Sequence, residues 1–146
     1  MSGYKVSELS GLELLRKMGK GEIPKASIAD TIPMEVISVD EGVVVFSAVA
    51  NDSHLNPLGF VHGGFASAVL DSVTACAIHS TLPAGVGFAT TDLNIKMIKP
   101  VPKNVTLIAE GKVINVAQKI GFSDGMLKSK SGIIYAHATA TCMILR

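Results

Sequence analysis

Residues 56–79 read NPLGFVHGGFASAVLDSVTACAIH. After His62, nearly every residue of this stretch is small or apolar, whichever side of a helix it would occupy. A helix that is apolar on all sides is typical of a protein interior rather than of its surface. We therefore expect a long buried helix that begins near Gly63 and ends near residues 81–85, where Pro83 breaks the pattern.

One carboxylate interrupts the apolar helix. Asp71 is the only charged residue between Asp52 and Asp92. A lone carboxylate in an apolar helix costs free energy unless it has hydrogen-bonding partners or a chemical task. Hydrogen bonding to Ser or Thr is the structural interpretation, and catalysis is the functional one. The cost of keeping the charge in this position favours catalysis.

A short helix and six strands are expected around the long helix, which makes an α+β fold. Ser10 and Glu13 form a capping-box pattern that opens the short helix, and Gly19 ends it. Residues 22–32 are expected to form a loop. Two strands joined by a polar turn, and four later strands that pair in sequence as an antiparallel meander, are expected at 34–39, 43–49, 88–98, 105–116, 120–128 and 133–145.

The composition indicates one domain, residues 1–146, that belongs to an assembly. Hydrophobic residues make up 48% of the chain and charged residues 17%, and this apolar excess indicates a subunit interface. The absence of Trp and an aromatic content of 5% argue against a stacking surface for nucleic acid. No signal peptide or membrane span is expected, so a cytoplasmic location is predicted. The two cysteines are expected to be free thiols.

Charge is divided unevenly along the chain. Residues 1–92 carry five basic and ten acidic residues, a net charge of −5, whereas residues 93–146 carry eight and two, a net charge of +6. A basic half without a basic run suits an anionic small molecule that bears phosphates. Solvent-exposed lysines on strands are the simpler interpretation of any single position.

The spacing of Asn56, Gly59, His62-Gly63-Gly64 and Asp71 resembles that of the PaaI-type acyl-CoA thioesterases. The later run TTDLNI, residues 90–95, also fits this family. The resemblance implies the hotdog fold, a curved antiparallel sheet of about six strands wrapped around one long buried helix. It also implies an enzyme that hydrolyses an acyl-CoA thioester without a cofactor. The sequence leaves the acyl group open.

The resemblance and the chemistry of the residues suggest the same catalytic roles. The N–H of Gly63, at the positive end of the helix dipole, would polarise the thioester carbonyl as an oxyanion hole. Asp71 would activate a water molecule or attack the thioester itself. His62 would orient the turn, Asn56 would hydrogen-bond near the reaction centre, and Thr90 would hold the water or the carbonyl.

Each of three roles has a structural alternative, and these stay open. Gly63 would serve only a tight turn, Asn56 would cap a loop, and Thr90 would pack on the helix. His54, His79 and His137 have no metal-ligand spacing, so no metal site is predicted.

The coenzyme is expected to contact the basic half of the chain. Relatives contact CoA through the turn that corresponds to residues 115–120, and Lys112 and Lys99 are near that turn in sequence. Gly64 and Asp92 are further expected substrate contacts. The turn consists of Asn115, Val116, Ala117, Gln118, Lys119 and Ile120.

The spacing of the two main catalytic candidates constrains the assembly. Gly63 and Asp71 are eight residues apart on the expected helix, a separation of about 12 Å at the helical rise per residue. One thioester carbon cannot contact both residues of the same chain. We therefore expect a homodimer with shared active sites, and the resemblance implies a dimer of dimers, a homotetramer.

Two other functions would fit a hotdog fold. A hydratase or dehydratase would need a histidine and a carboxylate paired for proton transfer, within a different loop motif. A non-catalytic acyl-CoA-binding protein would lack the carboxylate or carry an added DNA-binding segment. The HGG loop argues against the first function, and the presence of Asp71 argues against the second.

Overall fold

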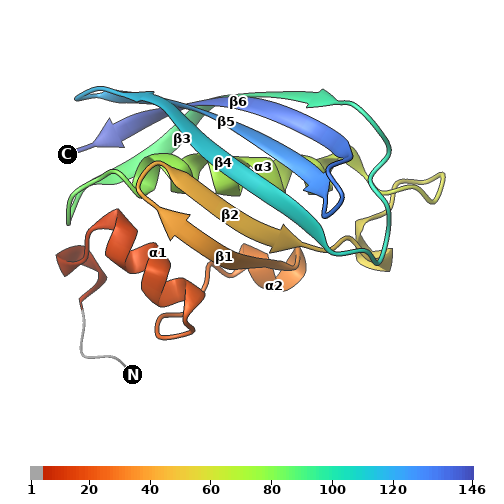
Figure 1. Ribbon diagram of the computed structural model, residues 1–146, viewed down its shortest axis with the longest axis horizontal. Helices are drawn as coiled ribbons and strands as arrows, with labels where there is room; N and C mark the ends of the chain where they lie inside the picture. Colours follow the sequence, from red (N-terminus) through yellow and green to blue (C-terminus); the bar gives the residue numbers. More distant parts are fainter. Residues whose placement is uncertain (1–4) are drawn as a thin grey trace.

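A computed structural model describes residues 5–146 of the chain, so residues 1–4 of the predicted single domain lie outside the described part. Figure 1 shows the order of the elements along the chain. The helical elements are the 3₁₀ helix η1 (Val6–Glu8), α1 (Gly11–Gly19), α2 (Ile28–Thr31), the 3₁₀ helix η2 (Asp52–His54) and α3 (Gly63–His79). The strands are β1 (Met34–Asp40), β2 (Val43–Ala48), β3 (Gly87–Met97), β4 (Leu107–Val116), β5 (Ile120–Ser129) and β6 (Ile134–Leu145).

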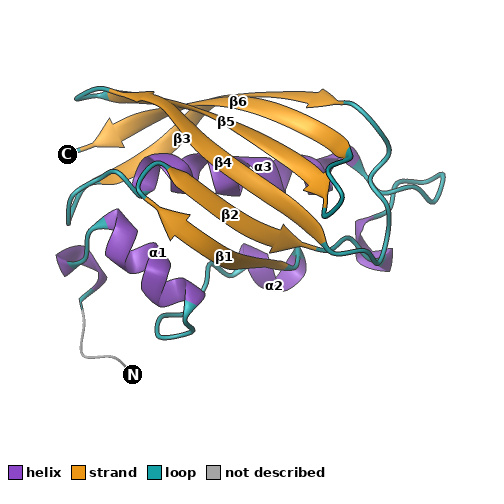
Figure 2. Ribbon diagram, in the orientation of Figure 1, coloured by secondary structure: helices purple, strands orange, loops and turns teal. Residues whose placement is uncertain are grey.

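The six strands form one antiparallel sheet in the order β1-β2-β4-β5-β6-β3. Figure 2 shows this sheet curving across one side of α3. The helix buries Phe65, Val69, Leu70 and Val73 in the core, while α1 and α2 lie along β1. This arrangement confirms the predicted fold of a curved sheet, one long helix and a short N-terminal helix.

Glycines in the sheet let α3 approach the strands closely. Gly111 on β4 lies under the α3 backbone, where an added Cβ would overlap the carbonyl oxygen of Val73. Gly125 on β5 faces Thr74, and Gly121 lies 3.1 Å, measured from its ideal Cβ position, from a methyl carbon of Ile78. The position of the central helix therefore depends on residues that have no side chain.

We predict that Gly111→Ala lowers the free energy of unfolding by about 1–3 kcal/mol, because the new methyl group forces α3 away from β4. Gly87→Ala is the matched control, since its Cβ would have only an ordinary contact, 3.9 Å from Leu145. Urea unfolding of both variants at one protein concentration measures the difference. Equal stability of the two variants would contradict this account of how α3 packs.

Three sequence-based expectations about the fold were wrong. The four later strands are not a meander in sequence order, because β3 pairs with β6 at the sheet edge and β4 pairs with β2. Residues 22–32 are not entirely loop, because α2 forms a single turn in which the Thr31 hydroxyl donates to the Ile28 carbonyl. Finally, α3 ends at His79 rather than near 81–85, where the Ser80 hydroxyl donates to the Ala77 carbonyl.

The long helix is also not buried all round. One stripe of α3 is only partly covered, and it contains Ser67, Ala68, Asp71, Ser72, Cys76 and His79. Part of the stripe faces β3, because the ring of His79 packs against Phe88 of that strand, and the residues from Asp71 to His79 line a cavity together with α1 and β1. No helix among residues 5–146 is both long and apolar enough to cross a membrane.

Candidate active site

Asp71 has a hydrogen-bonding partner from another element. The Thr90 hydroxyl on β3 donates to the Asp71 carboxylate at 2.8 Å. The β3 strand has a bulge between Thr90 and Asp92, and bulges re-aim side chains next to functional sites. The structure therefore brings together two of the residues that the sequence proposed for catalysis.

Two thiols lie near this pair. Cys142 Sγ is 3.8 Å from the Thr90 hydroxyl oxygen. Burial, with a smaller contribution from the Asp71 carboxylate, raises the pKa of Cys76 to about 12. Burial also raises the pKa of Cys142. Both cysteines are free, as predicted, and neither is a thiolate at neutral pH, so Asp71 is the stronger candidate for nucleophile or base.

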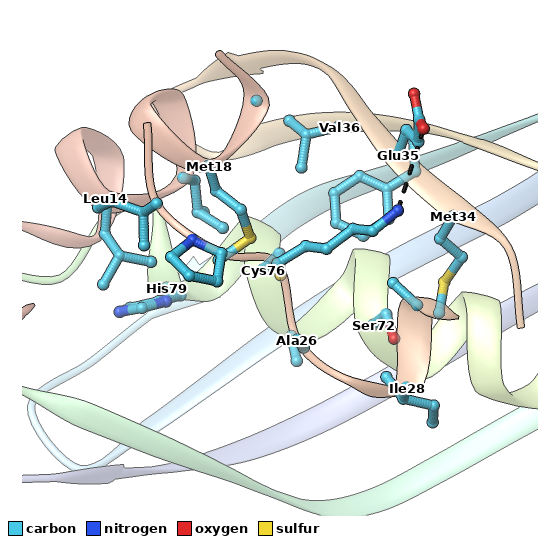
Figure 3. A pocket seen from close by; sticks show the side chains of 18 of the residues that line it. Leu14, Met18, Ala26, Ile28, Met34, Glu35, Val36, Ser72, Cys76 and His79 are labelled. Atoms are coloured by element: carbon cyan, nitrogen blue, oxygen red, sulfur yellow. Dashed lines mark ion pairs between the residues drawn. The ribbon is translucent and has the colours of Figure 1, made fainter. Parts of the chain in front are cut away.

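Asp71 and Thr90 also line a large cavity. The cavity has a volume of about 710 Å³ and lies between α3, α1, the 21–29 segment and β1. Figure 3 shows Leu14 and Met18 on its α1 side, with Cys76 and His79 across from them on α3. A pocket of this volume can hold a drug-sized or cofactor-sized molecule.

The N-terminus of α3 carries the HGG loop. His62 is the N-cap, and its Nδ1 accepts a hydrogen bond from the Gly64 N–H at 2.7 Å. This contact caps the first turn of α3, and it occupies the Gly64 N–H. Within residues 5–146, no acceptor is found for the Gly63 N–H, and Gly63 is exposed. A second cavity, about 340 Å³ in volume, is lined by Gly63, Met97 and Lys99 among others.

Asn56 organises the loop before α3. Its side-chain oxygen accepts hydrogen bonds from the N–H groups of Leu58 at 3.0 Å and Phe60 at 3.1 Å. The loop turns at Gly59, where φ is +84° and a side chain would be strained. These hydrogen bonds are the ones expected if Asn56 caps the loop, which is the structural alternative to a catalytic role.

The remaining predicted contacts lie apart from Asp71. Asp92 is exposed on β3 and accepts a hydrogen bond from Asn94 at 3.4 Å. The 115–120 turn lies at the C-terminal end of α3, because Val116 packs against the cluster that contains Ala75 and Ile78. Lys99 lies beside Gly63, at the opposite end of α3, so the structure separates it from that turn.

The family of the chain follows from comparison with known proteins. The family model of the thioesterase superfamily matches residues 58–136, more than half of the chain. The chain belongs to the thioesterase superfamily. Membership confirms the predicted PaaI-type hotdog resemblance and places the chain in a family of thioester hydrolases.

Solved structures have the same fold as this chain. A phenylacetic acid degradation-related protein from Ralstonia eutropha is 34% identical, with a TM-score of 0.80 over 88% of this chain and 98% of that one. PaaI from Escherichia coli is 20% identical, with a TM-score of 0.80 over 90% and 94%. A Streptococcus pneumoniae thioesterase protein solved with coenzyme A is 22% identical, with a TM-score of 0.70 over 76% and 87%.

The match to curated sequences is more limited. The chain spans 44% and 58% of the lengths of the first two curated relatives that it matches, which is about half. These relatives are named as esterases, from Halobacterium salinarum and Caenorhabditis elegans, and they are 35% and 29% identical over 45% and 70% of this chain.

Sequence reasoning missed two parts of the candidate site. The 710 Å³ cavity is walled by α1 and the 21–29 segment, which were interpreted as a peripheral helix and a loop. Arg146 also lies at the 115–120 turn, where its Nε donates to the Gln118 carbonyl at 3.0 Å. The positive charge of the C-terminal half could have drawn attention to Arg146. The position of Arg146 at the turn, however, depends on the pairing of β5 with β6, which the sequence does not show.

Proposed function

We propose that the chain is an acyl-CoA thioesterase that hydrolyses its substrate to a free acid and CoA. The observation that carries the proposal is the Asp71–Thr90 hydrogen bond on the wall of a large cavity. Membership in the thioesterase superfamily supports the reaction, and a fold neighbour solved with coenzyme A supports the coenzyme.

In the proposed reaction, Asp71 acts in one of two ways. As a base, it takes a proton from water while the water oxygen attacks the thioester carbon. As a nucleophile, it forms an anhydride that water then cleaves. Both routes break the bond between the carbonyl carbon and sulfur, and the CoA thiolate leaves and takes up a proton. Thr90 positions the carboxylate through its hydroxyl.

The carbonyl oxygen needs a donor that Asp71 cannot supply. We place the Gly63 N–H of the partner subunit in this role, because α3 is one continuous helix from Gly63 to His79. Eight residues of helix separate Gly63 and Asp71 within a chain by about 12 Å. A donor at the helix N-terminus also has the favourable end of the dipole.

The edge of the sheet supports a dimer of this kind. Within residues 5–146, the eleven residues of β3 pair with β6 on one side only. An unpaired edge strand of this length favours pairing with another chain. A two-fold axis would then set the two α3 helices antiparallel, with each Gly63 near the partner's Asp71.

We further propose that two dimers form a tetramer through the outer surface of the sheet. Five apolar side chains are exposed there, at the ends of β4, β5 and β6. They are Ile114, Ile120, Phe122, Met143 and Leu145. The residues next to them along each strand point to the opposite face of the sheet, toward α3. An exposed apolar group of this kind is typical of an interaction surface. Light scattering after size exclusion would measure the number of subunits.

In the antiparallel dimer, the 115–120 turn would lie near the 55–61 loop of the partner subunit, because Val116 of the turn packs at the C-terminal end of α3. We therefore propose that this turn binds the phosphates of CoA. Lys119 supplies a charge, and Arg146 adds a second one through its contact with Gln118.

We predict that Lys119→Ala weakens CoA binding about two- to fivefold, the size expected for one exposed charge contact. Added salt should weaken binding to the wild type more than to the variant. Lys130→Ala is the matched control, since Lys130 is an exposed lysine in the β5–β6 turn at the other end of the strands. Calorimetry with CoA gives the affinities, and equal binding by wild type and Lys119→Ala would move the nucleotide site elsewhere.

The function itself is tested by measuring free thiol released from a panel of acyl-CoA thioesters. We expect turnover with at least one member of the panel. Binding without thiol release would support the acyl-CoA-binding alternative, and hydration of an enoyl-CoA without thiol release would support the hydratase alternative.

A further inference from the structure

The 710 Å³ cavity extends away from the proposed reaction centre along α3. Asp71 and Thr90 lie on its wall, and from Asp71 the cavity follows α3 through Ala75 and Cys76 to His79. Figure 3 shows Leu14 of α1 beside His79 and Met18 of α1 beside Cys76, while Ala26 and Ile28 lie toward Ser72. A group attached to a thioester at Asp71 therefore has open space along the helix toward His79.

The side chains around this space select for an apolar group. Opposite α3, the walls are supplied by Leu14, Leu15, Met18, Ile23 and Phe46. The polar groups Asp71, Ser72 and Thr90 gather around the reaction centre, leaving His79 as the polar group at the far end. Burial lowers the pKa of His79, so its ring is uncharged at neutral pH.

The two other charged residues on the wall are engaged with each other. Lys25 Nζ lies 4.0 Å from a carboxylate oxygen of Glu35, and both side chains extend to solvent, with exposures of 42% and 76%. Figure 3 shows the Glu35 carboxylate, with its dashed ion pair, on the β1 side of the cavity. An occupant next to α3 therefore meets no unpaired charge beyond Asp71.

The length of the space sets the length of the occupant. Asp71 and His79 are eight residues apart on α3, which is about 12 Å along the helix axis. An extended polypeptide advances about 3.3–3.6 Å per residue, which is three backbone bonds. At the same advance per bond, an extended acyl chain fills the distance from Asp71 to His79 with roughly ten bonds.

We propose that this cavity is the acyl pocket and that the substrate is a CoA thioester of a straight-chain, uncharged acyl group of about ten carbons. The proposal rests on the proposed thioesterase function, and it adds the substrate class and the residue that limits chain length. Met18 is that residue, because it comes from α1 and lies beside Cys76, on the way from Asp71 to His79 at the far end of the pocket.

The test is a chain-length profile of kcat/KM with straight-chain acyl-CoAs from two to sixteen carbons, together with phenylacetyl-CoA. In the wild type, kcat/KM should rise about fourfold for each added methylene, as expected for burying one CH₂, and level off near ten carbons. A maximum at phenylacetyl-CoA without a rise along the straight-chain series would overturn the proposal.

Two substitutions of Met18 should move the chain length at which kcat/KM levels off, and they should move it in opposite directions. Met18→Trp should shift this chain length downward and lower kcat/KM for decanoyl-CoA at least tenfold. The value of kcat/KM for butyryl-CoA should stay within about twofold of the wild type. Met18→Ala should shift the levelling-off to longer chains. Leu12→Ala is the control for lost packing, because Leu12 packs against the core from the same helix but does not line the cavity.

The possible results separate this proposal from the proposed function. A wild-type protein that releases no thiol from any member of the panel would refute the thioesterase function. An active wild type whose profile is unchanged in both Met18 variants, or shifts equally in Leu12→Ala, would refute the acyl pocket alone.

Discussion

Asp71→Asn is expected to lower kcat at least about 100-fold, the loss typical of removing a general base or nucleophile. Asparagine keeps the size of the side chain and still accepts the hydrogen bond from Thr90. Folding and acyl-CoA binding should therefore persist. Thiol release measures the activity, and calorimetry with a non-hydrolysable acyl-CoA analogue measures binding.

Two further variants show whether the loss belongs to Asp71. Thr90→Val removes the hydroxyl that positions the carboxylate but keeps the side-chain shape, so it should reduce kcat about tenfold, in line with loss of a hydrogen bond to a charged group. Cys142→Ala removes the neighbouring thiol and should leave kcat within about twofold if that protonated thiol takes no part in the reaction. Near-normal turnover by Asp71→Asn would refute the proposed mechanism.

The local features of this protein could be predicted from sequence because they depend on neighbours in the chain. The capping box of Ser10 and Glu13 is formed as expected. The position of Asp71 also stood out, since a single charge in an apolar helix needs a partner, and the structure supplies Thr90 from β3. The HGG loop likewise opens α3 with His62 as its cap.

The long-range features could not be predicted in the same way. Alternation shows that residues 87–97 form a strand, but it does not say which edge of the sheet the strand occupies. The segment between β3 and β4 is long enough to cross the end of the sheet, and β4 pairs with β2 rather than with β3. The cavity was missed for a related reason, because α2 is a single turn without periodicity.

Two inactive variants are expected to restore activity when they share a dimer. The first is Asp71→Asn, and the second is Gly63→Pro, which removes the proposed oxyanion donor. In a mixed dimer, one site carries both defects and the other carries neither, because a two-fold axis exchanges the contributions of the chains. A purified hybrid should therefore have about half of the wild-type activity, and random pairing about a quarter.

Local geometry favours proline at Gly63. It is the first residue of α3, the position at which helices tolerate proline best. His62 has φ of −66° and ψ of +140°, the extended backbone that a residue before proline requires. The nearest obstacle to a Cβ is the Cε of Met97 at 3.1 Å, the flexible end of a side chain.

Gly63→Ala is the matched control, since it meets the same Met97 methyl group but keeps the N–H. We expect this variant to stay active, which would assign the loss in Gly63→Pro to the missing donor. The hybrid is obtained by co-expression with two different tags, and its folding and dimerisation are checked before thiol release is measured. A folded hybrid as inactive as its parents would mean that Gly63 and Asp71 do not meet across the interface. An active Gly63→Pro homodimer would remove Gly63 from the oxyanion hole, because no other part of that residue can donate to the thioester carbonyl.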